Sequence, residues 1–484
     1  MDQRMPHAEL TDRDRSITMI GILTAMLLAA LDQSIVTPAM PTIGGALGNA
    51  EYLPWIVTAY LLTATAAAPL YGKIADIYGR RGTLYAALGL FLLGSVIAAL
   101  AANLFVLIGA RAVQGLGGGG LFALSQILIG DLLPPRERGR YAAWISGMWA
   151  VAGIAGPLLG GTLAEYDWSL IFWLNLPLGV VAMLVINEPL KKLGKRSRTH
   201  RLDIWGAVLL VIATSALLLV LNWGGISYPW SSPQVLGLLT VSLVFWIAFA
   251  TRLSRAKEPL VSLEVLSNRI ALAGCFAMFM VAAVNVGLAV YLPVYAQGYL
   301  GLSPAESGYA LLGFLLGAVA GATLGGRLTL RVVHAKRIAI VGAAISGLGL
   351  IAAGLMVNDR SLAALEAVLV LIGVGMGMTF PVTTVSVQNA VDQRHLGVAT
   401  GMLTFLRSLG AALGVAVFGA ILLAFAIPLG HGRGGELLHV ANPWPFAVVY
   451  YAMAASMVVA AGIYGLMPHK ELRGRHEPAP ALAE

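Results

Sequence analysis

Charge is scarce in this sequence: of its 484 residues only 11% are Asp, Glu, Lys or Arg, whereas 58% are hydrophobic. Soluble globular proteins have about 25% charged residues, so this composition excludes an ordinary soluble domain. Apolar runs long enough for membrane-spanning helices recur along the whole chain. The composition therefore predicts an all-α polytopic membrane protein.

Cysteine is nearly absent as well. The single Cys275 excludes an intrachain disulfide and a cysteine-based metal cluster. The eight histidines are scattered, with no H-E-x-x-H pair, and the sequence has no G-x-x-x-x-G-K-[ST] phosphate loop. We therefore expect no metal, no cofactor and no enzymatic site. No stretch between the apolar runs is long enough for a separate signalling domain.

Hydropathy predicts about fourteen membrane-spanning helices. Their approximate bounds are 17–40, 54–70, 84–102, 104–129, 141–163, 170–186, 204–221, 235–250, 270–296, 307–325, 338–357, 362–385, 398–427 and 446–467. The first run is too long for a cleaved signal peptide, and the segment before it lacks a basic region, so we expect it to remain as a helix.

The basic residues fall on alternate loops. With the N-terminus inside, all but four of the 31 Lys and Arg residues lie in cytoplasmic segments; Arg360 and Arg433 lie in outer loops, and Arg111 and Arg407 within spans. Positive charge is retained on the cytoplasmic side. This predicts a multi-pass protein of the cell (inner) membrane with both termini in the cytoplasm. Topology explains the net charge of +8, so no nucleic-acid partner is expected.

Asp32 is an acid inside the first predicted span. An ionised Asp near the centre of a membrane helix costs about 2.5–3.5 kcal/mol on insertion scales, so it needs a partner or a wet cavity. One interpretation is a carboxylate that snorkels or only fixes helix packing. The other is a titratable proton site on a transport pathway.

Arg111 is a natural partner for that acid. At a rise of ~1.5 Å per residue, Arg111 lies about 10 Å and Asp32 about 12 Å from the outer ends of their spans. We expect the two opposite charges to offset each other's burial, so that proton uptake by Asp32 releases Arg111. A switched pair and a static, structural pair both satisfy this spacing.

A glycine-rich charged loop, GKIADIYGRRG, follows the second span at residues 72–82. Gly72 and Gly79 permit tight turns and close helix approach, and Asp76 can accept from Arg80 or cap a helix start. The loop resembles the signature loop of the major facilitator superfamily. The resemblance implies a conformational latch built from Gly72, Asp76, Gly79, Arg80 and Arg81; an ordinary charged turn is the alternative.

Further stretches resemble the fourteen-helix drug:proton antiporter branch of that superfamily. They are LDQSIVTPAMP (31–41), RAVQGLGGGG (111–120), GIAGPLLGG (153–161), WSLIFWLNLPLG (168–179) and, more weakly, YLPVYAQ (291–297) and LRSLGAALGVAVFG (406–419). In the third, Pro157 removes a helix hydrogen bond, and Gly153, Gly156 and Gly160 allow close helix approach. The resemblance implies an antiporter helix that seals or opens a cavity; a fixed kink is the alternative.

A weak internal repeat predicts two halves. The loop at 72–82 resembles GGRLTLRVVHAKR at 325–337, although the second copy lacks the acid. This suits the major facilitator fold: six-helix bundles at 17–187 and 270–467, joined by residues 188–269 with a basic linker and two inserted helices. Residues 1–16 and 468–484 are then cytoplasmic tails, and the linker would lie on anionic lipid at the inner leaflet.

Candidate substrate contacts are apolar, aromatic and amide side chains together with one arginine. They are Gln33, Trp55, Tyr60, Gln114, Trp149, Asn285, Tyr291, Tyr295, Phe380 and Arg407. Broad-specificity sites use adaptable aromatic surfaces with few polar anchors. Core or lipid-facing packing is the alternative for each apolar residue, and Arg407 could face the cavity or snorkel inward.

Together these features predict a secondary active transporter that acts as a monomer. It would export apolar or cationic drugs in exchange for protons, as two halves rock about a central cavity. Export of one endogenous metabolite, antibiotic or lipid on the same fold is the alternative. Uptake is disfavoured because the glycine–proline stretch at 153–161 resembles exporters.

Overall fold

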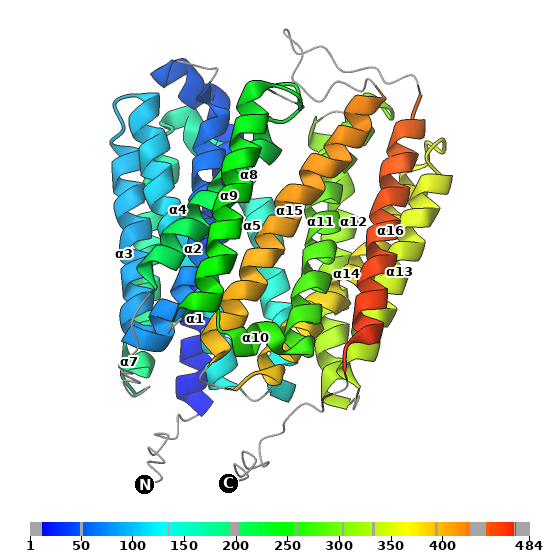
Figure 1. Ribbon diagram of the computed structural model, residues 1–484. Coiled ribbons are helices and arrows are strands. Elements are labelled where there is room, and N and C mark those ends of the chain that lie inside the picture. Colours follow the sequence, from blue (N-terminus) through cyan, green and yellow to red (C-terminus); the bar gives the residue numbers. More distant parts are fainter. Residues whose placement is uncertain are drawn as a thin grey trace. The chain divides into compact units, whose positions relative to one another are not determined.

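A computed structural model describes residues 12–470, apart from 49–51, 134, 193–202, 226, 257–258, 303, 332–333, 393–394, 426–441 and 469. Throughout these ranges the chain is built of helices, and no strand forms in them (Figure 1). The predicted all-α class is confirmed. Most of the basic linker, most of both terminal tails and Arg433 lie outside the described residues.

The helices run in chain order from α1 to α16 (Figure 1). The first nine are α1 (Asp12–Leu47), α2 (Pro54–Tyr78), α3 (Arg80–Ala99), α4 (Leu104–Leu132), α5 (Pro135–Tyr166), α6 (Leu170–Trp173), α7 (Asn175–Lys192), α8 (Ile204–Trp223) and α9 (Pro233–Arg255). The others are α10 (Leu263–Ser267), α11 (Arg269–Gly298), α12 (Pro304–Arg331), α13 (Ala335–Leu355), α14 (Leu362–Ala390), α15 (Leu396–Ala424) and α16 (Trp444–Leu466).

Thirteen helices in the described ranges are long and apolar enough to cross a membrane. The long helix outside this group is α2, whose 25 residues include Lys73 and Asp76 near its end. By length it also reaches across a bilayer core of about 30 Å. The predicted set of about fourteen spans therefore corresponds to these thirteen helices and α2.

The predicted span at 170–186 is confirmed as the apolar span Leu170–Asn187, which contains a one-residue interruption between two helices. α6 ends at Trp173 and α7 begins at Asn175. Pro177 has no N–H, and its ring clashes with the carbonyl four residues earlier, that of Trp173. Leu174 between them keeps helical angles, φ −56° and ψ −30°. The break therefore interrupts hydrogen bonding without making a turn.

The chain divides into two compact units. Unit 1 contains residues 1–128, 147–265 and 397–416, and unit 2 contains 129–146, 266–396 and 417–484. If the chain were divided at the basic linker, residues 129–146 would fall in the first unit and residues 397–416 in the second. In the structure each of these segments belongs to the other unit. The boundaries of the two predicted six-helix bundles stay a prediction.

Unit 1 contains the first seven helices in large part and the α8–α9 hairpin. Ser232 and Asp203 cap the two hairpin helices, and Asp203 also accepts a charged hydrogen bond from Arg252 at 3.1 Å. The hairpin packs on α2, where the Trp55 and Trp223 rings lie 5.5 Å apart. The two inserted helices are thus fixed to the second helix of the chain.

Unit 2 is held by close helix packing. α12 and α14 cross so closely that a methyl group at Gly317 or Gly321 would collide with backbone of α14, and one at Gly373 or Gly377 with backbone of α12. In membranes small residues permit such approach and increase van der Waals contact. α13 packs on the same α14 and on α16.

Arg138 connects residues 129–146 to α14 within unit 2. Its guanidinium donates to the carbonyls of Leu133 and Gly130 at the end of α4, and to Gln388 Oε1 of α14 at 3.1 Å. Burial lowers the pKa of Arg138 to about 10, against the opposing effect of Asp131. The side chain therefore stays charged at neutral pH and ties this segment to α14.

Candidate proton-coupling site

Asp32 and Arg111 lie in direct contact in unit 1. Arg111 Nη1 donates to Asp32 Oδ2 at 2.6 Å, and the two side chains are 0% and 1% exposed. The predicted partners are therefore brought together, each out of water. A buried pair of this kind neutralises both charges, and loss of either partner would leave the other uncompensated.

The arginine is fixed by several further groups. Its Nη1 also donates to Gln114 Oε1 at 2.6 Å, and its Nε donates to the Ile56 carbonyl at 3.2 Å. The guanidinium lies over the rings of Tyr60, at 4.4 Å, and Phe172, at 5.8 Å. Such cation–π contacts stabilise a desolvated cation. Arg111 is therefore positioned by residues of α1, α2, α4 and α6.

The second oxygen of Asp32 is held by two amides. Gln114 Nε2 donates to Asp32 Oδ1 at 2.7 Å, and Asn175 Nδ2 donates to the same oxygen at 2.9 Å. Both amides also donate to Ser95 Oγ. Ser95 and Asn175 are absent from the sequence-based prediction. The signal available for them was a polar residue in an apolar membrane run.

The predicted antiporter helix packs on α1 beside this site. Ser34, two residues after Asp32, donates to the Ala152 carbonyl of α5 at 2.7 Å. Gly156 and Gly160 are buried there, and a methyl group at either would collide with Ser34 or with the Ile35 carbonyl. Gly153 and Pro157 lie on the exposed face of α5. The contact between α5 and α1 thus lies within one helical turn of the acid.

The predicted latch residues surround the α2–α3 junction. Asp76 Oδ1 and Arg80 Nη1 form an ion pair at 2.6 Å, and Gly79 turns the chain with φ 92°, a left-handed value that favours glycine. Arg81 donates to Asn187 of α7 at 2.9 Å. Gly72 touches the backbone of Gly397, the second residue of α15.

The Asp76 carboxylate also lies against the start of α15, since a methyl group at Gly397 would meet both of its oxygens. A helix N-terminus attracts negative charge. This arrangement joins the end of α2 to the start of α15 inside unit 1.

Comparison with known proteins assigns the family. The sequence model of the Major Facilitator Superfamily matches residues 22–415 and 270–481. The chain belongs to the major facilitator superfamily. It is therefore a membrane transporter and not an enzyme.

Individual relatives agree with this assignment. The multidrug transporter protein MdtP of Bacillus subtilis is 31% identical over 425 residues, covering 88% of this chain and 77% of that protein. The MFS-type efflux pump LUC4 of Fusarium is 34% identical over 409 residues, 83% and 72% of the two chains. The human organic anion transporter MFSD10 has a similar fold, with TM-score 0.65, 17% identity and coverage of 93% and 99%.

The predicted substrate contacts of this transporter are divided between the two units. In unit 1, Trp149 stacks on Phe122 at 5.2 Å, and Trp55 and Gln33 are half-buried. Tyr60 and Gln114 belong to the Asp32–Arg111 site. Arg407 of α15 makes no hydrogen bond or ion pair with any residue that the structure describes.

In unit 2, Tyr295 is 2% exposed and donates to the Val357 carbonyl, and Tyr291 is also buried. Asn285 contacts the sulfur of Met376 at 3.8 Å, and Phe380 is half-buried on α14. The substrate role of all ten residues stays a prediction.

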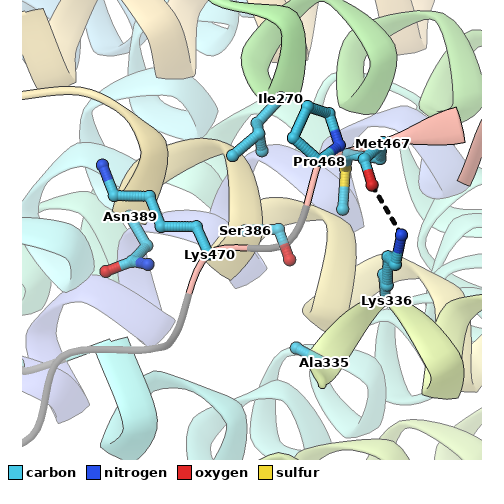
Figure 2. A pocket seen from close by; sticks show the side chains of 8 residues that line it. All are labelled: Ile270, Ala335, Lys336, Ser386, Asn389, Met467, Pro468 and Lys470. Carbon is cyan, nitrogen blue, oxygen red and sulfur yellow. Dashed lines mark hydrogen bonds between the residues drawn. The ribbon is translucent and has the colours of Figure 1, made fainter. Parts of the chain in front are cut away.

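A small pocket in unit 2 is lined by none of these residues (Figure 2). It opens between α11, α13, α14 and the segment after α16, and its polar lining includes Lys336, Ser386, Asn389 and Lys470. Lys336 Nζ donates to the Met467 carbonyl at 2.7 Å (Figure 2), and Lys470 Nζ donates to that of Ala390 at 3.2 Å. The lysines tie the chain after α16 to α13 and α14.

Proposed function

We propose that this transporter exports a small molecule across the cell membrane in exchange for protons, with Asp32 as the proton-binding group. The observation that carries the proposal is the geometry of that acid: it is fully buried in a membrane-spanning helix and paired with Arg111 at 2.6 Å. A buried ionisable residue in a membrane span commonly marks a proton or ion pathway. The relatives named multidrug transporter and efflux pump support export.

In this mechanism the charge of Asp32 decides which state is stable. A proton arriving from outside neutralises the carboxylate and frees Arg111, which weakens the tie between α1 and α4. Because Asp32 is 0% exposed, helices must separate before the proton enters or leaves. Release of the proton to the cytoplasm restores the ion pair and resets the transporter.

The latch and α5 would connect this event to alternating access. The contact between Asp76 and the start of α15 stabilises one state, and the α1–α5 packing carries the change outward from Asp32. The substrates are apolar or cationic compounds, drugs and antibiotics among them, that bind against aromatic side chains such as Trp55 and Trp149. Both termini face the cytoplasm, and the monomer in the lipid bilayer is the working unit.

The test is substrate-dependent proton movement in proteoliposomes that hold a pH-sensitive dye. Asp32→Asn keeps the shape of the side chain but binds no proton, so we expect the substrate-dependent pH change to fall to background. The matched control is Asp203→Asn, since Asp203 is also buried and ion-paired but caps α8. Normal coupled transport by Asp32→Asn would refute the proposal.

Substrate breadth is tested in the same vesicles by competition. We expect structurally unrelated apolar cations to inhibit transport of one dye. Inhibition by a single metabolite series alone would replace drug export with export of that metabolite. Failure of inside-out vesicles to accumulate substrate when their interior is acidic would count against export.

A further inference from the structure

The polar groups at Asp32 Oδ1 form a closed ring. Gln114 Nε2 donates to Asp32 Oδ1 at 2.7 Å and to Ser95 Oγ at 2.8 Å. Asn175 Nδ2 donates to the same two oxygens at 2.9 and 3.1 Å. All four side chains are at most 1% exposed. An amide nitrogen has two N–H groups, and both amides use each of theirs inside the ring.

The direction of every bond in the ring is fixed. Ser95 Oγ donates its one hydrogen to the Phe91 carbonyl at 3.1 Å, so its lone pairs accept from the two amides. Gln114 Oε1 accepts from Arg111, which turns the Gln114 nitrogen toward Asp32. Asp32 thus receives donors on both oxygens: two amides on Oδ1 and the guanidinium on Oδ2.

A protonated carboxyl group does not fit this arrangement. Its O–H would need an acceptor, but the described partners of both oxygens are donors whose orientation is fixed. Hydrogen bonds to the charged form of an acid favour that form. Proton uptake by Asp32 therefore requires that at least one of these donors leaves.

We propose that Ser95 and Asn175 are positioning residues that hold Asp32 in its charged form, and that proton uptake requires the Asn175 amide to leave. This inference rests on the proposed role of Asp32 as the proton site. Asn175 is the donor placed to move, because it is the first residue of α7, directly after the break at Leu174. The ring thus connects Asp32 of α1 with Asn175 of α7 and Ser95 of α3, so movement of α7 away from α3 would remove a donor from Asp32.

Two charged or ionisable side chains also face this site. They are Arg111 from α4, the ion-pair partner of Asp32, and the Tyr60 phenol from α2, whose ring lies against the Arg111 guanidinium. α3 and α7 face Asp32 with the uncharged Ser95 and Asn175.

The test follows the carboxylic C=O stretch of Asp32 by infrared titration of the purified full-length protein. The Asp32 band is the one that Asp32→Asn removes. In Ser95→Ala and in Asn175→Leu we expect its half-maximal pH to rise by about one unit, a roughly tenfold gain in proton affinity. Ser95→Thr keeps the hydroxyl and should restore the wild-type value.

The matched control is Ser346→Ala, because Ser346 is equally buried and donates to a backbone carbonyl, but in unit 2. A titrating Asp32 band that neither Ser95→Ala nor Asn175→Leu raises would overturn this inference and leave the proposed function standing. If no titrating band depends on Asp32, the proposed function fails and the inference fails with it.

Discussion

Arg111 and Asp32 stabilise each other only as a pair. Both side chains are buried, at 1% and 0% exposure, so each charge depends on its partner and on the surrounding amides. Removing one member of a buried ion pair costs about 3–5 kcal/mol, because an uncompensated charge remains out of water. Removing both charges leaves a neutral site. The stability of the pair is therefore strongly non-additive.

This predicts a rescue at the residue scale. Arg111→Gln should destabilise the purified transporter by about 3–5 kcal/mol, and adding Asp32→Asn should recover a large part of that loss. Thermal unfolding in detergent, followed by tryptophan fluorescence, measures both variants. Arg337→Gln, at an exposed arginine, should leave the melting temperature unchanged. Simple addition of the two single effects would show that the pair is not coupled.

At the scale of the element, α5 meets α1 through glycine. Gly160 is buried, and a methyl group there would collide with the backbone carbonyl of Ile35. The adjacent Gly161 has nothing within 4 Å of an added methyl group. Because backbone yields less readily than a flexible side chain, the two positions should differ sharply. Overpacking typically costs about 1–3 kcal/mol.

The prediction compares alanine substitutions at two adjacent glycines of α5, Gly160 and Gly161. Gly160→Ala should push α5 away from α1, lower stability by about 1–3 kcal/mol and reduce transport several-fold. Gly161→Ala should preserve transport and slightly increase helix stability, since alanine is the better helix former. Melting temperature and dye efflux report the two effects. Equal behaviour of both variants would contradict close α1–α5 packing as a requirement for transport.

At the scale of the whole molecule, the proposed orientation follows from charge placement. Positive residues cluster in loops on one side of the predicted topology. The single Cys275 is 1% exposed, so the wild-type chain should react little with a membrane-impermeant maleimide. Because labelling of the wild-type chain is low, a single cysteine introduced elsewhere shows on which side of the membrane it lies.

Two such cysteines test the orientation. Asn358, exposed between α13 and α14, is predicted outside, and Leu263 of α10, 51% exposed, is predicted inside. In intact cells Asn358→Cys should be labelled, whereas Leu263→Cys should react only after permeabilisation. The reverse pattern would invert the proposed topology. Cys275→Ala alone is the unlabelled control.

The fold was predictable because its signal is local. Long apolar runs define membrane helices by length and hydropathy, and thirteen helices in the described ranges match that criterion. The break at Leu174 was missed, although Pro177 marks it, because hydropathy does not detect a lost hydrogen bond. The contact of residues 129–146 with unit 2 has no local signal in the sequence, because Arg138 meets Gln388, 250 residues later.

The sequence by itself determined the all-α membrane class, the family resemblance and the two charges at similar depth, since these follow from composition and helical rise. Only the tertiary structure decided that Asp32 and Arg111 touch, and that Ser95 and Asn175 complete their surroundings. Depth along a helix is a property of the chain. The rotation of each helix about its axis, which decides what a side chain meets, is set by packing against neighbouring helices.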